Sequence, residues 1–370
     1  MQLKSRFVSF LKDKYSSLST EGVSDLISEQ LLSSFHVQLT PQQLAQIEDE
    51  IKAYWKLRNE LSLPLSPAFD AKGLVRSNTQ SVCTSYDFHI NSDGKPELIE
   101  INTNAAFLAL GLAMYDFHGV NPPVNFNEAA LIEMFANELR LVGAQDQSIA
   151  IIDENPQAQR LYIEFLVYRD LFKRHGITCD IFDVADVERY QNFGLIYNRY
   201  TDFYLSDPKS QKLRELYNRR KNLSPGPYDY FLLADKQRLL DWNENVEVQR
   251  PQSLLHIYDL GKADKETIWK ERKNLFIKPK NSFGSKQAYK GASMSRKLFD
   301  EIYGSQFVAQ QLSVPSEIEV DLASGRERFK YDLRCFAYGE KLQLIVARLY
   351  QGQTTNLRTP GGGFAVVKIS

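Results

Sequence analysis

The stretch between residues 146 and 225 limits the fold more than any other part of the chain. Three apolar runs of strand length occur there, at residues 149–152, 179–184 and 193–197. A helix-forming segment separates the first two runs; it begins at Asn155-Pro156 and ends before Gly176. Strand, helix and strand at this spacing predict a βαβ unit and a parallel sheet. We therefore predict a Rossmann-like domain, and because it lacks a GxGxxG sequence we do not predict a dinucleotide site.

The third of these strands ends in Tyr197 and is followed closely by Arg199. Ligands of open parallel sheets bind at the carboxyl ends of the strands. We predict that Tyr197 and Arg199 face a substrate, and the alternative is an arginine that points into solvent.

Length and composition exclude several classes of protein. The 370 residues predict two or three domains, and the formal net charge of −1 gives no attraction to nucleic acid or anionic membranes. The longest apolar run, residues 107–115, is far shorter than the ~20 residues that span a bilayer. Residues 1–15 lack an apolar signal core, and the 3 cysteines form neither a disulfide framework nor a CxxC metal site. We expect a cytoplasmic protein without a nucleic-acid or membrane partner.

The N-terminal part is predicted to be helical over residues 1–60. An apolar face recurs at Leu3, Phe7, Phe10 and Leu11. Thr40-Pro41 is a good helix start, because Pro is favoured at the first helical position.

Residues 86–104 predict a hairpin that could hold a metal ion. Its strands, residues 87–90 and 98–102, flank a turn of Asn, Ser, Asp and Gly at residues 91–94. Side chains two residues apart on a strand share a face, so Glu100 and Asn102 point the same way, with Asp87 across the hairpin. Three oxygen ligands suit Mg²⁺. The alternative is an ordinary polar face.

Two apolar strands in the third quarter of the chain border polar segments. The strand at residues 276–279 carries Lys278 and leads into a loop with Ser282, Gly284, Ser285 and Lys286. Backbone N–H groups of such a loop approach phosphate oxygens, and a lysine adds charge, although the Walker A spacing is absent. A basic hairpin turn is the alternative. The strand at residues 307–312 either presents backbone groups to an adenine edge or is a plain core strand.

The C-terminal part predicts a further hairpin, with Arg334 on one strand and Arg348 on the return strand. A polar loop with Asn356 follows, and then the run Gly361 to Gly363. Paired arginines beside such a loop make a site for anionic groups, and a surface ion-pair ladder is the alternative. Consecutive glycines indicate close approach or positive φ.

Together these motifs resemble the ATP-grasp superfamily of ATP-dependent carboxylate–amine ligases. The E-x-N element, Glu100 to Asn102, stands near the start of this chain, whereas it comes last in the common arrangement. This order resembles the circularly permuted members, among them eukaryotic-type glutathione synthetase and glutathionylspermidine synthetase. The resemblance implies an α+β fold with an α/β subdomain: a circularly permuted ATP-grasp core, a Rossmann-like pre-ATP-grasp domain and an N-terminal helical segment. The implied divisions are residues 1–75 (helical segment), 76–145 (metal hairpin and helix), 146–225 (Rossmann-like), 229–320 (nucleotide lobe) and 321–370 (late strands that pack with 76–145).

The resemblance also implies roles for individual residues. ATP would be bound by Lys236, Lys278, Ser282, Gly284, Ser285, Lys286, Gln310, Gln311, Leu312 and Asp332, and Mg²⁺ by Asp87, Glu100 and Asn102. Arg334, Arg348 and Asn356 would be catalytic, and Arg76, Asn104, Arg199, Gly361 and Gly362 would contact substrates.

The implied reaction joins a carboxylate and an amine, each a small molecule or a peptide, through an acyl phosphate. Two alternatives stay open: a phosphotransferase acting on a small molecule, and a degenerate ATP-grasp module that binds without turnover. The oligomeric state, a homo-oligomer included, also stays open.

Overall fold

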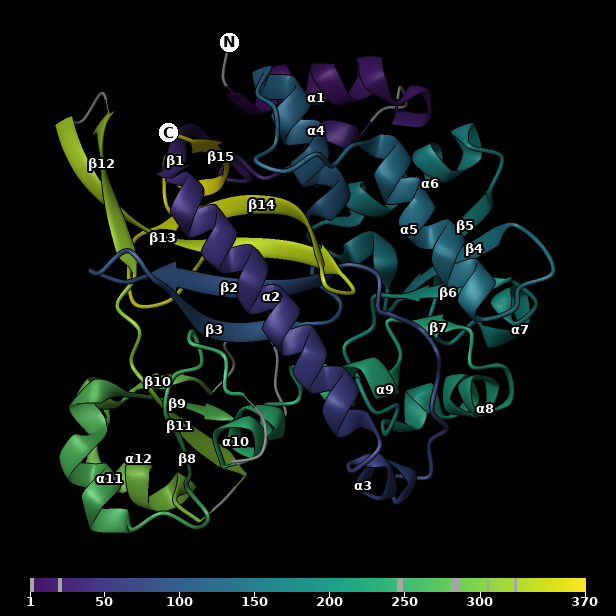
Figure 1. The fold of residues 1–370 in the computed structure, drawn as a ribbon. Helices are drawn as coiled ribbons and strands as arrows, with labels where there is room; N and C mark the ends of the chain where they lie inside the picture. The colour runs from purple at the N-terminus through teal and green to yellow at the C-terminus, as the bar shows by residue number, and fades with distance from the viewer. Residues whose placement is uncertain (1–2, 19–21, 245–248, 281–286, 305, 323–324) are drawn as a thin grey trace.

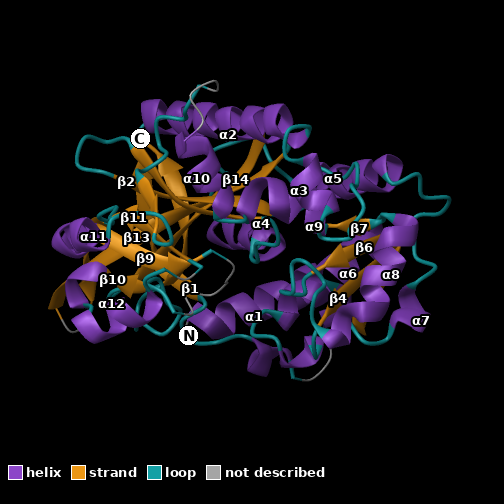
Figure 2. Cartoon of the chain, turned by 90° about the horizontal axis from the view of Figure 1, so that it is seen from below, coloured by secondary structure: helices purple, strands orange, loops and turns teal. Residues whose placement is uncertain are grey.

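The computed structural model describes residues 3–18, 22–244, 249–280, 287–304, 306–322 and 325–370. Its α-helices are α1 Leu3–Lys14, α2 Pro41–Ser62, α3 Ser66–Asp70, α4 Leu108–His118, α5 Glu128–Leu141, α6 Tyr162–Arg174, α7 Val187–Tyr190, α8 Gln211–Arg220, α9 Pro227–Asp229, α10 Gln237–Glu244, α11 Lys265–Glu271 and α12 Arg296–Ile302. These helices surround three sheets (Figure 2).

The largest sheet joins strands from both ends of the chain (Figure 1). Its order is β1 (Leu32–Leu39), β15 (Gly363–Ile369), β14 (Lys341–Tyr350), β13 (Gly325–Tyr338), β2 (Thr84–Ile90) and β3 (Pro96–Asn102), and β12 (Ser316–Leu322) also pairs with β13. The β1–β15 pair is parallel and the other pairs are antiparallel. The hairpin predicted at residues 86–104 is therefore confirmed as β2 and β3, and it lies beside the C-terminal hairpin.

Helices cover both faces of this sheet. Alternation along β14 sends Ile345 into the core that α2 covers and Val346 into the core that α4 covers. α2 begins as the sequence predicts, because Thr40 and Gln43 form a reciprocal capping box ahead of Pro41. Figure 1 shows α2 crossing the whole sheet.

The N-terminal segment differs from the prediction in one element. Residues 32–39, predicted to be helical, form strand β1 because β15 offers it a parallel partner over most of its length. The apolar face of α1 is confirmed, since Phe7 and Leu11 are fully buried. The rings of Phe7 and Phe10 pack on Phe117, which belongs to α4.

The second sheet is the parallel sheet that the strand–helix–strand pattern predicts. Its order is β5 (Thr178–Asp183), β4 (Ser148–Asp153), β6 (Leu195–Asn198) and β7 (Leu223–Ser224), and every pairing is parallel. α5 and α6 cover one face, and α3 and α8 contribute to the core on the other.

The third sheet has the order β10 (Tyr289–Lys290), β9 (Leu275–Pro279), β11 (Phe307–Gln311) and β8 (Ile257–Asp259), and α11 and α12 supply part of its core. It lies next to β3 of the large sheet, because Lys278 on β9 and Gln310 on β11 bond to backbone oxygens of that strand. Among the described helices, none combines the length and apolar character needed to cross a membrane.

Candidate active site

The charged side chains of the two hairpins meet on neighbouring rungs of the large sheet. Arg334 stands opposite Asp87, and Asp87 stands opposite Glu100. Arg348 stands opposite Asp332 on the next pair of strands. Val346 and Arg348 are two residues apart on β14, so this charged row continues the sheet face that α4 covers further along.

The carboxylate of Asp87 is fully buried and accepts hydrogen bonds at both oxygens. Arg334 donates from Nε to Oδ1 (3.1 Å) and from Nη2 to Oδ2 (2.8 Å), and Arg348 Nη2 donates to Oδ2 (2.8 Å). Ser85 Oγ and Asn102 Nδ2 donate at 3.0 and 3.3 Å. Burial alone raises the pKa of Asp87, but the two guanidinium groups outweigh it and hold the pKa at about 2.

Arg348 is shared between two carboxylates. Its Nε donates to Asp332 Oδ1 at 2.6 Å, while its Nη2 bonds to Asp87. The hydroxyl of Thr355 donates to the other oxygen of Asp332. The result is a continuous chain of charge-assisted bonds that fixes both arginines in place.

The three residues expected to bind metal do converge. Asn102 Nδ2 lies 3.3 Å from Asp87 Oδ2 and 3.3 Å from Glu100 Oε1. No three His, Cys, Asp or Glu side chains in the described ranges form a candidate metal site. A metal here would therefore depend on Glu100 and the amide oxygen of Asn102, because the lone pairs of Asp87 already accept five donors.

Lys278 is the best-defined cation of the site. Its Nζ donates to the carbonyl of Ile99 (2.8 Å) and to Gln310 Oε1 (2.7 Å), and the residue is 5% exposed. Burial, and to a smaller extent the charge of Lys236, lower the pKa of Lys278 to about 7, although Glu100 opposes the shift. Two buried lysines within electrostatic reach of each other form an arrangement that favours an anionic ligand.

The position of Lys236 depends on Asp235. Asp235 Oδ1 accepts from the backbone of Gln237 (2.9 Å), which caps the start of α10, and Oδ2 accepts the hydroxyl proton of Tyr204. Tyr204 belongs to the loop after β6, so the parallel sheet helps to hold the lysine. Sequence reasoning missed Tyr204, because no local pattern pairs it with Asp235.

The strand at residues 307–312 was expected to present backbone groups to an adenine edge, but the backbone N–H groups at its end are already hydrogen-bonded. The side chain of Gln310 binds Lys278 and donates to Leu98 O (3.3 Å). The backbone N–H of Gln311 bonds to His256 O and that of Leu312 to Asn274 O, both at 2.8 Å. An adenine edge would thus not be read by these two amides.

A cleft of about 410 Å³ lies between the parallel sheet and the large sheet. It is lined by Asn102, Asn104, Ala105, Ala106, Asp153, Glu154, Gln159, Arg199, Tyr200, Thr201 and Arg334. Arg199 donates from Nη1 to the carbonyls of Asn104 and Ala105, the latter at 3.0 Å. Burial raises the pKa of Asp153 to about 6 against the opposing effect of Arg199.

Tyr197 does not face this cleft, contrary to the prediction. It is fully buried, its hydroxyl lies 3.3 Å from Cys83 Sγ, and its ring packs edge-on against Phe135 and Tyr168. Side chains alternate along a strand, so Tyr197 enters the core that α5 and α6 cover.

Several expected site residues make their contacts elsewhere. Arg76 bonds to Asp70 and Ser66 at α3. Asn356 bonds to backbone groups and to Thr359 within its own loop, residues 351–359. The residues of the predicted phosphate loop, Ser282, Gly284, Ser285 and Lys286, lie outside the described ranges.

The glycine run has a packing explanation. A Cβ on Gly362 would lie 2.5 Å from the carbonyl oxygen of Leu349, and one on Gly363 would lie 2.5 Å from the carbonyl oxygen of Gln30. Gly361 has φ +77°. These glycines let β15 enter between β1 and β14, and substrate contacts of Gly361 and Gly362 stay a prediction.

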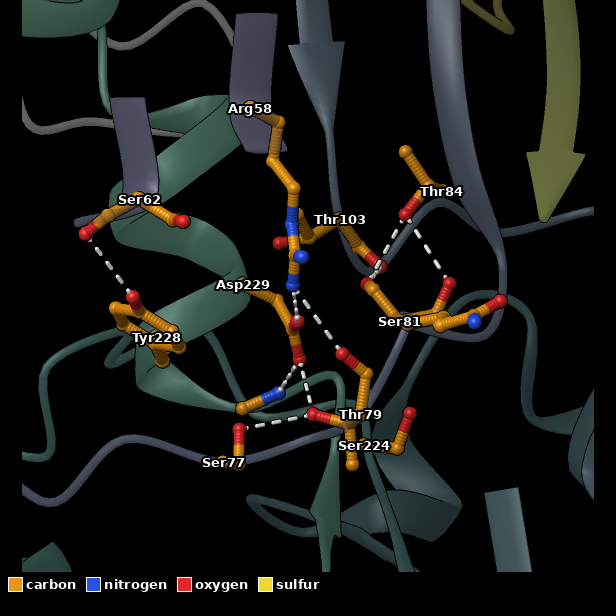
Figure 3. Close-up of polar contacts among 12 residues, drawn as sticks. Arg58, Ser62, Ser77, Thr79, Ser81, Thr84, Thr103, Ser224, Tyr228 and Asp229 are labelled. Carbon is orange, nitrogen blue, oxygen red and sulfur yellow. Dashed lines mark hydrogen bonds and ion pairs between the residues drawn. The ribbon is translucent and has the colours of Figure 1, made fainter. Parts of the chain in front are cut away.

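A buried polar network centred on Asp229 joins α2 to the segments before β2 and around α9 (Figure 3). Asp229 accepts from the Gly226 amide (2.9 Å), from Thr79 Oγ1 (2.7 Å) and from Arg58 Nη2 (3.4 Å). It thereby ties the π-helical turn Tyr230–Ala234 to α2 and to the segment before β2. Sequence reasoning had no signal for this network, since Thr79 and Arg58 stand 150 and 171 residues from Asp229.

Comparison with known proteins shows the fold and leaves the activity open. No protein-family model and no curated protein matches the chain by sequence. A glutathione synthetase-like effector from Globodera pallida, in its apo form, aligns with 92% of this chain and 90% of its own length, at 11% identity and a TM-score of 0.58. A candidate gamma-glutamylcysteine synthetase from Methylobacillus flagellatus aligns with 90% of both chains at 11% identity and a TM-score of 0.45. The chain therefore shares its overall fold with the glutathione synthetase-like effector.

Proposed function

We propose that this protein is an ATP- and Mg²⁺-dependent ligase that joins a carboxylate to an amine through an acyl phosphate. The observation that carries the proposal is the buried lysine pair. Lys278 is oriented by Ile99 O and Gln310 and lies within electrostatic reach of Lys236. The negative charge of a bound polyphosphate would attract both lysines and raise the pKa of Lys278, so that its ammonium form is favoured.

Mg²⁺ fits the site through Glu100 and Asn102 rather than through Asp87. In the described part of the chain Glu100 accepts a bond only from the Asn102 amide, so it keeps open lone pairs. When bound, the metal would neutralise charge on the phosphate oxygens. Asp87 would keep its bonds to the arginines.

The arginines supply the positive charge that phosphoryl transfer requires. Asp87 orients Arg334, and Asp87 together with Asp332 orients Arg348. Arg334 also lines the cleft, so it would contact the proposed acceptor while it stays bonded to Asp87. In the proposed reaction the acceptor carboxylate attacks the γ-phosphorus of ATP, ADP leaves and an acyl phosphate forms, while the arginines stabilise the developing charge. The amine then attacks the acyl carbon and loses a proton, and phosphate leaves as the amide forms.

The cleft supports an acceptor with groups of both signs. Arg199 and Arg334 would bind carboxylate, while Asp153 and Glu154 would bind an ammonium group or a hydrogen-bond donor. The Rossmann-like sheet contributes this lining from the carboxyl ends of β4 and β6, as open parallel sheets do.

One observation favours a second candidate, a module that binds nucleotide without turnover. The carboxylate of Asp87, expected to bind metal, is fully occupied by protein donors. The site would then hold fewer metal ligands than phosphoryl transfer commonly uses.

Product analysis separates these candidates. The protein is incubated with Mg²⁺, ATP and a panel of amino acids, dipeptides and amines, and ADP, phosphate and new amides are measured by chromatography and mass spectrometry. A ligase gives all three products, and Lys278→Met abolishes them. A stable phosphoester would instead identify a phosphotransferase. Binding of ATP without ADP formation across the panel would identify the non-catalytic module.

A further inference from the structure

The turn before Lys236 carries a buried tyrosine whose hydroxyl has no hydrogen-bond partner among the residues that the structure describes. Tyr230 is 4% exposed, and its hydroxyl makes no hydrogen bond in the described part of the chain. Leaving a buried hydroxyl unsatisfied costs about 1–3 kcal/mol. Such a group therefore calls for an explanation, and an absent ligand is one.

The ring of Tyr230 is held firmly by two aromatic residues of the loop after β6. Phe203 stacks on it with centroids 4.1 Å apart and planes 7° apart, and Tyr204 meets it edge-on at 5.2 Å. The Tyr204 hydroxyl is already engaged with Asp235. These two ring contacts limit the positions that the Tyr230 hydroxyl oxygen can take.

Tyr230 lies close to two residues next to the proposed phosphate site, Asp235 and Glu100. The carbonyl of Tyr230 accepts from the amide of Asp235 (2.9 Å), which places the residue one turn before Lys236. Burial first, and then the charges of Asp235 and Glu100, raise the pKa of Tyr230 far above its usual value. The hydroxyl therefore stays protonated at neutral pH and has a proton to donate, and neither carboxylate accepts it.

We propose that the Tyr230 hydroxyl donates a hydrogen bond to an anionic oxygen of the polyphosphate ligand, beside Lys236 and Lys278. The inference rests on the proposed function, because it assigns a ligand to that same site. It adds a neutral donor from the π-helical turn to the two lysines. It also links the parallel sheet to nucleotide binding, since Phe203 and Tyr204 set the ring.

The test replaces the hydroxyl and keeps the ring. Tyr230→Phe retains both aromatic contacts, and Tyr86→Phe is the matched control. Tyr86 is also fully buried with a hydroxyl that lacks a partner among the described residues, but it lies in the core beneath α2. Calorimetry measures the Kd of each protein for MgATP, for inorganic tripolyphosphate and for adenosine, and a thermal melt measures the unliganded protein.

The expected result is a loss of phosphate binding alone. Tyr230→Phe weakens MgATP and tripolyphosphate about tenfold or more, as loss of a bond to a charged group does. It leaves the Kd for adenosine and the unliganded Tm unchanged or slightly raised. Tyr86→Phe changes none of the three Kd values.

Two results would overturn this inference alone. Equal Kd values for the parent and Tyr230→Phe would leave the lysine site intact and remove the tyrosine from it. A lower Tm, together with a loss of affinity for adenosine equal to the loss for the phosphate ligands, would assign the hydroxyl a structural role. If the parent bound neither MgATP nor tripolyphosphate, the proposed function itself would fall together with this inference.

Discussion

Nucleotide binding should be coupled to proton uptake by Lys278. With a pKa of about 7 in the unliganded protein, the lysine is roughly 10% protonated at pH 8. A polyphosphate beside it favours the charged form and moves the pKa back toward its usual value. Binding at pH 8 should therefore take up about 0.9 proton per ATP, and binding at pH 6 only about 0.1.

The assay is calorimetry of ATP binding in buffers with different ionisation enthalpies. The slope of the observed enthalpy against the buffer enthalpy gives the number of protons taken up. Lys278→Met should remove the uptake along with most of the affinity. Lys280→Met is the control, because Lys280 lies two residues away and pairs with Asp259 at 2.9 Å. A proton uptake near zero at pH 8 in the parent protein would refute the proposal that a lysine with a lowered pKa lies in the phosphate site.

The same lysine predicts how stability depends on pH. The folded pKa of about 7 lies below the ordinary value of 10.5, so the unfolded chain binds more protons between these values. The stability of the unliganded protein therefore rises with pH across that range. Lys278→Met removes a cost whose upper limit is roughly 4–5 kcal/mol. Its stabilising effect should be largest at or below pH 7 and should fade toward pH 10.

Three further predictions concern single residues. Asp87→Asn should destabilise the protein by about 3–5 kcal/mol in urea unfolding, because it leaves Arg334 and Arg348 buried with less negative charge; an unchanged midpoint would contradict the clamp. Arg199→Ala should raise the KM for the acid substrate more than that for ATP, and unchanged constants for both would remove Arg199 from the acceptor cleft. Gly362→Ala should cost about 1–3 kcal/mol of stability, because its Cβ would lie 2.5 Å from Leu349 O; a thermal melt measures this, and a parent-like Tm would disprove the packing explanation.

Local patterns in the sequence predicted much of the secondary structure. The apolar runs and turn residues of 146–225 predicted the parallel sheet, and the alternation of residues 98–102 placed Glu100 and Asn102 on one face. Both are properties of neighbouring residues, since strand pleat and helix pitch follow from backbone geometry alone. The pairing of the two hairpins was reached through the resemblance to a family, and the permuted order that it implies stays a prediction.

Other features had no local signal because their partners are distant in the sequence. Residues 32–39 are a strand only because β15, more than 300 residues later, lies beside them. The carboxylate of Asp87 was read as a metal ligand, yet its donors Arg334 and Arg348 stand 247 and 261 residues away. The sequence alone does not distinguish a carboxylate that binds a metal ion from one that pairs with an arginine.

The sequence by itself identified the charged residues that were predicted to form one site. Only the tertiary structure decided what each of them contacts. Lys278 is a buried lysine with a lowered pKa because β9 packs against β3. Tyr230 packs against Phe203 and Tyr204, and its hydroxyl has no hydrogen-bond partner among the described residues. Burial and partner distance are set by the order of strands and the packing of domains, and these depend on the whole chain at once.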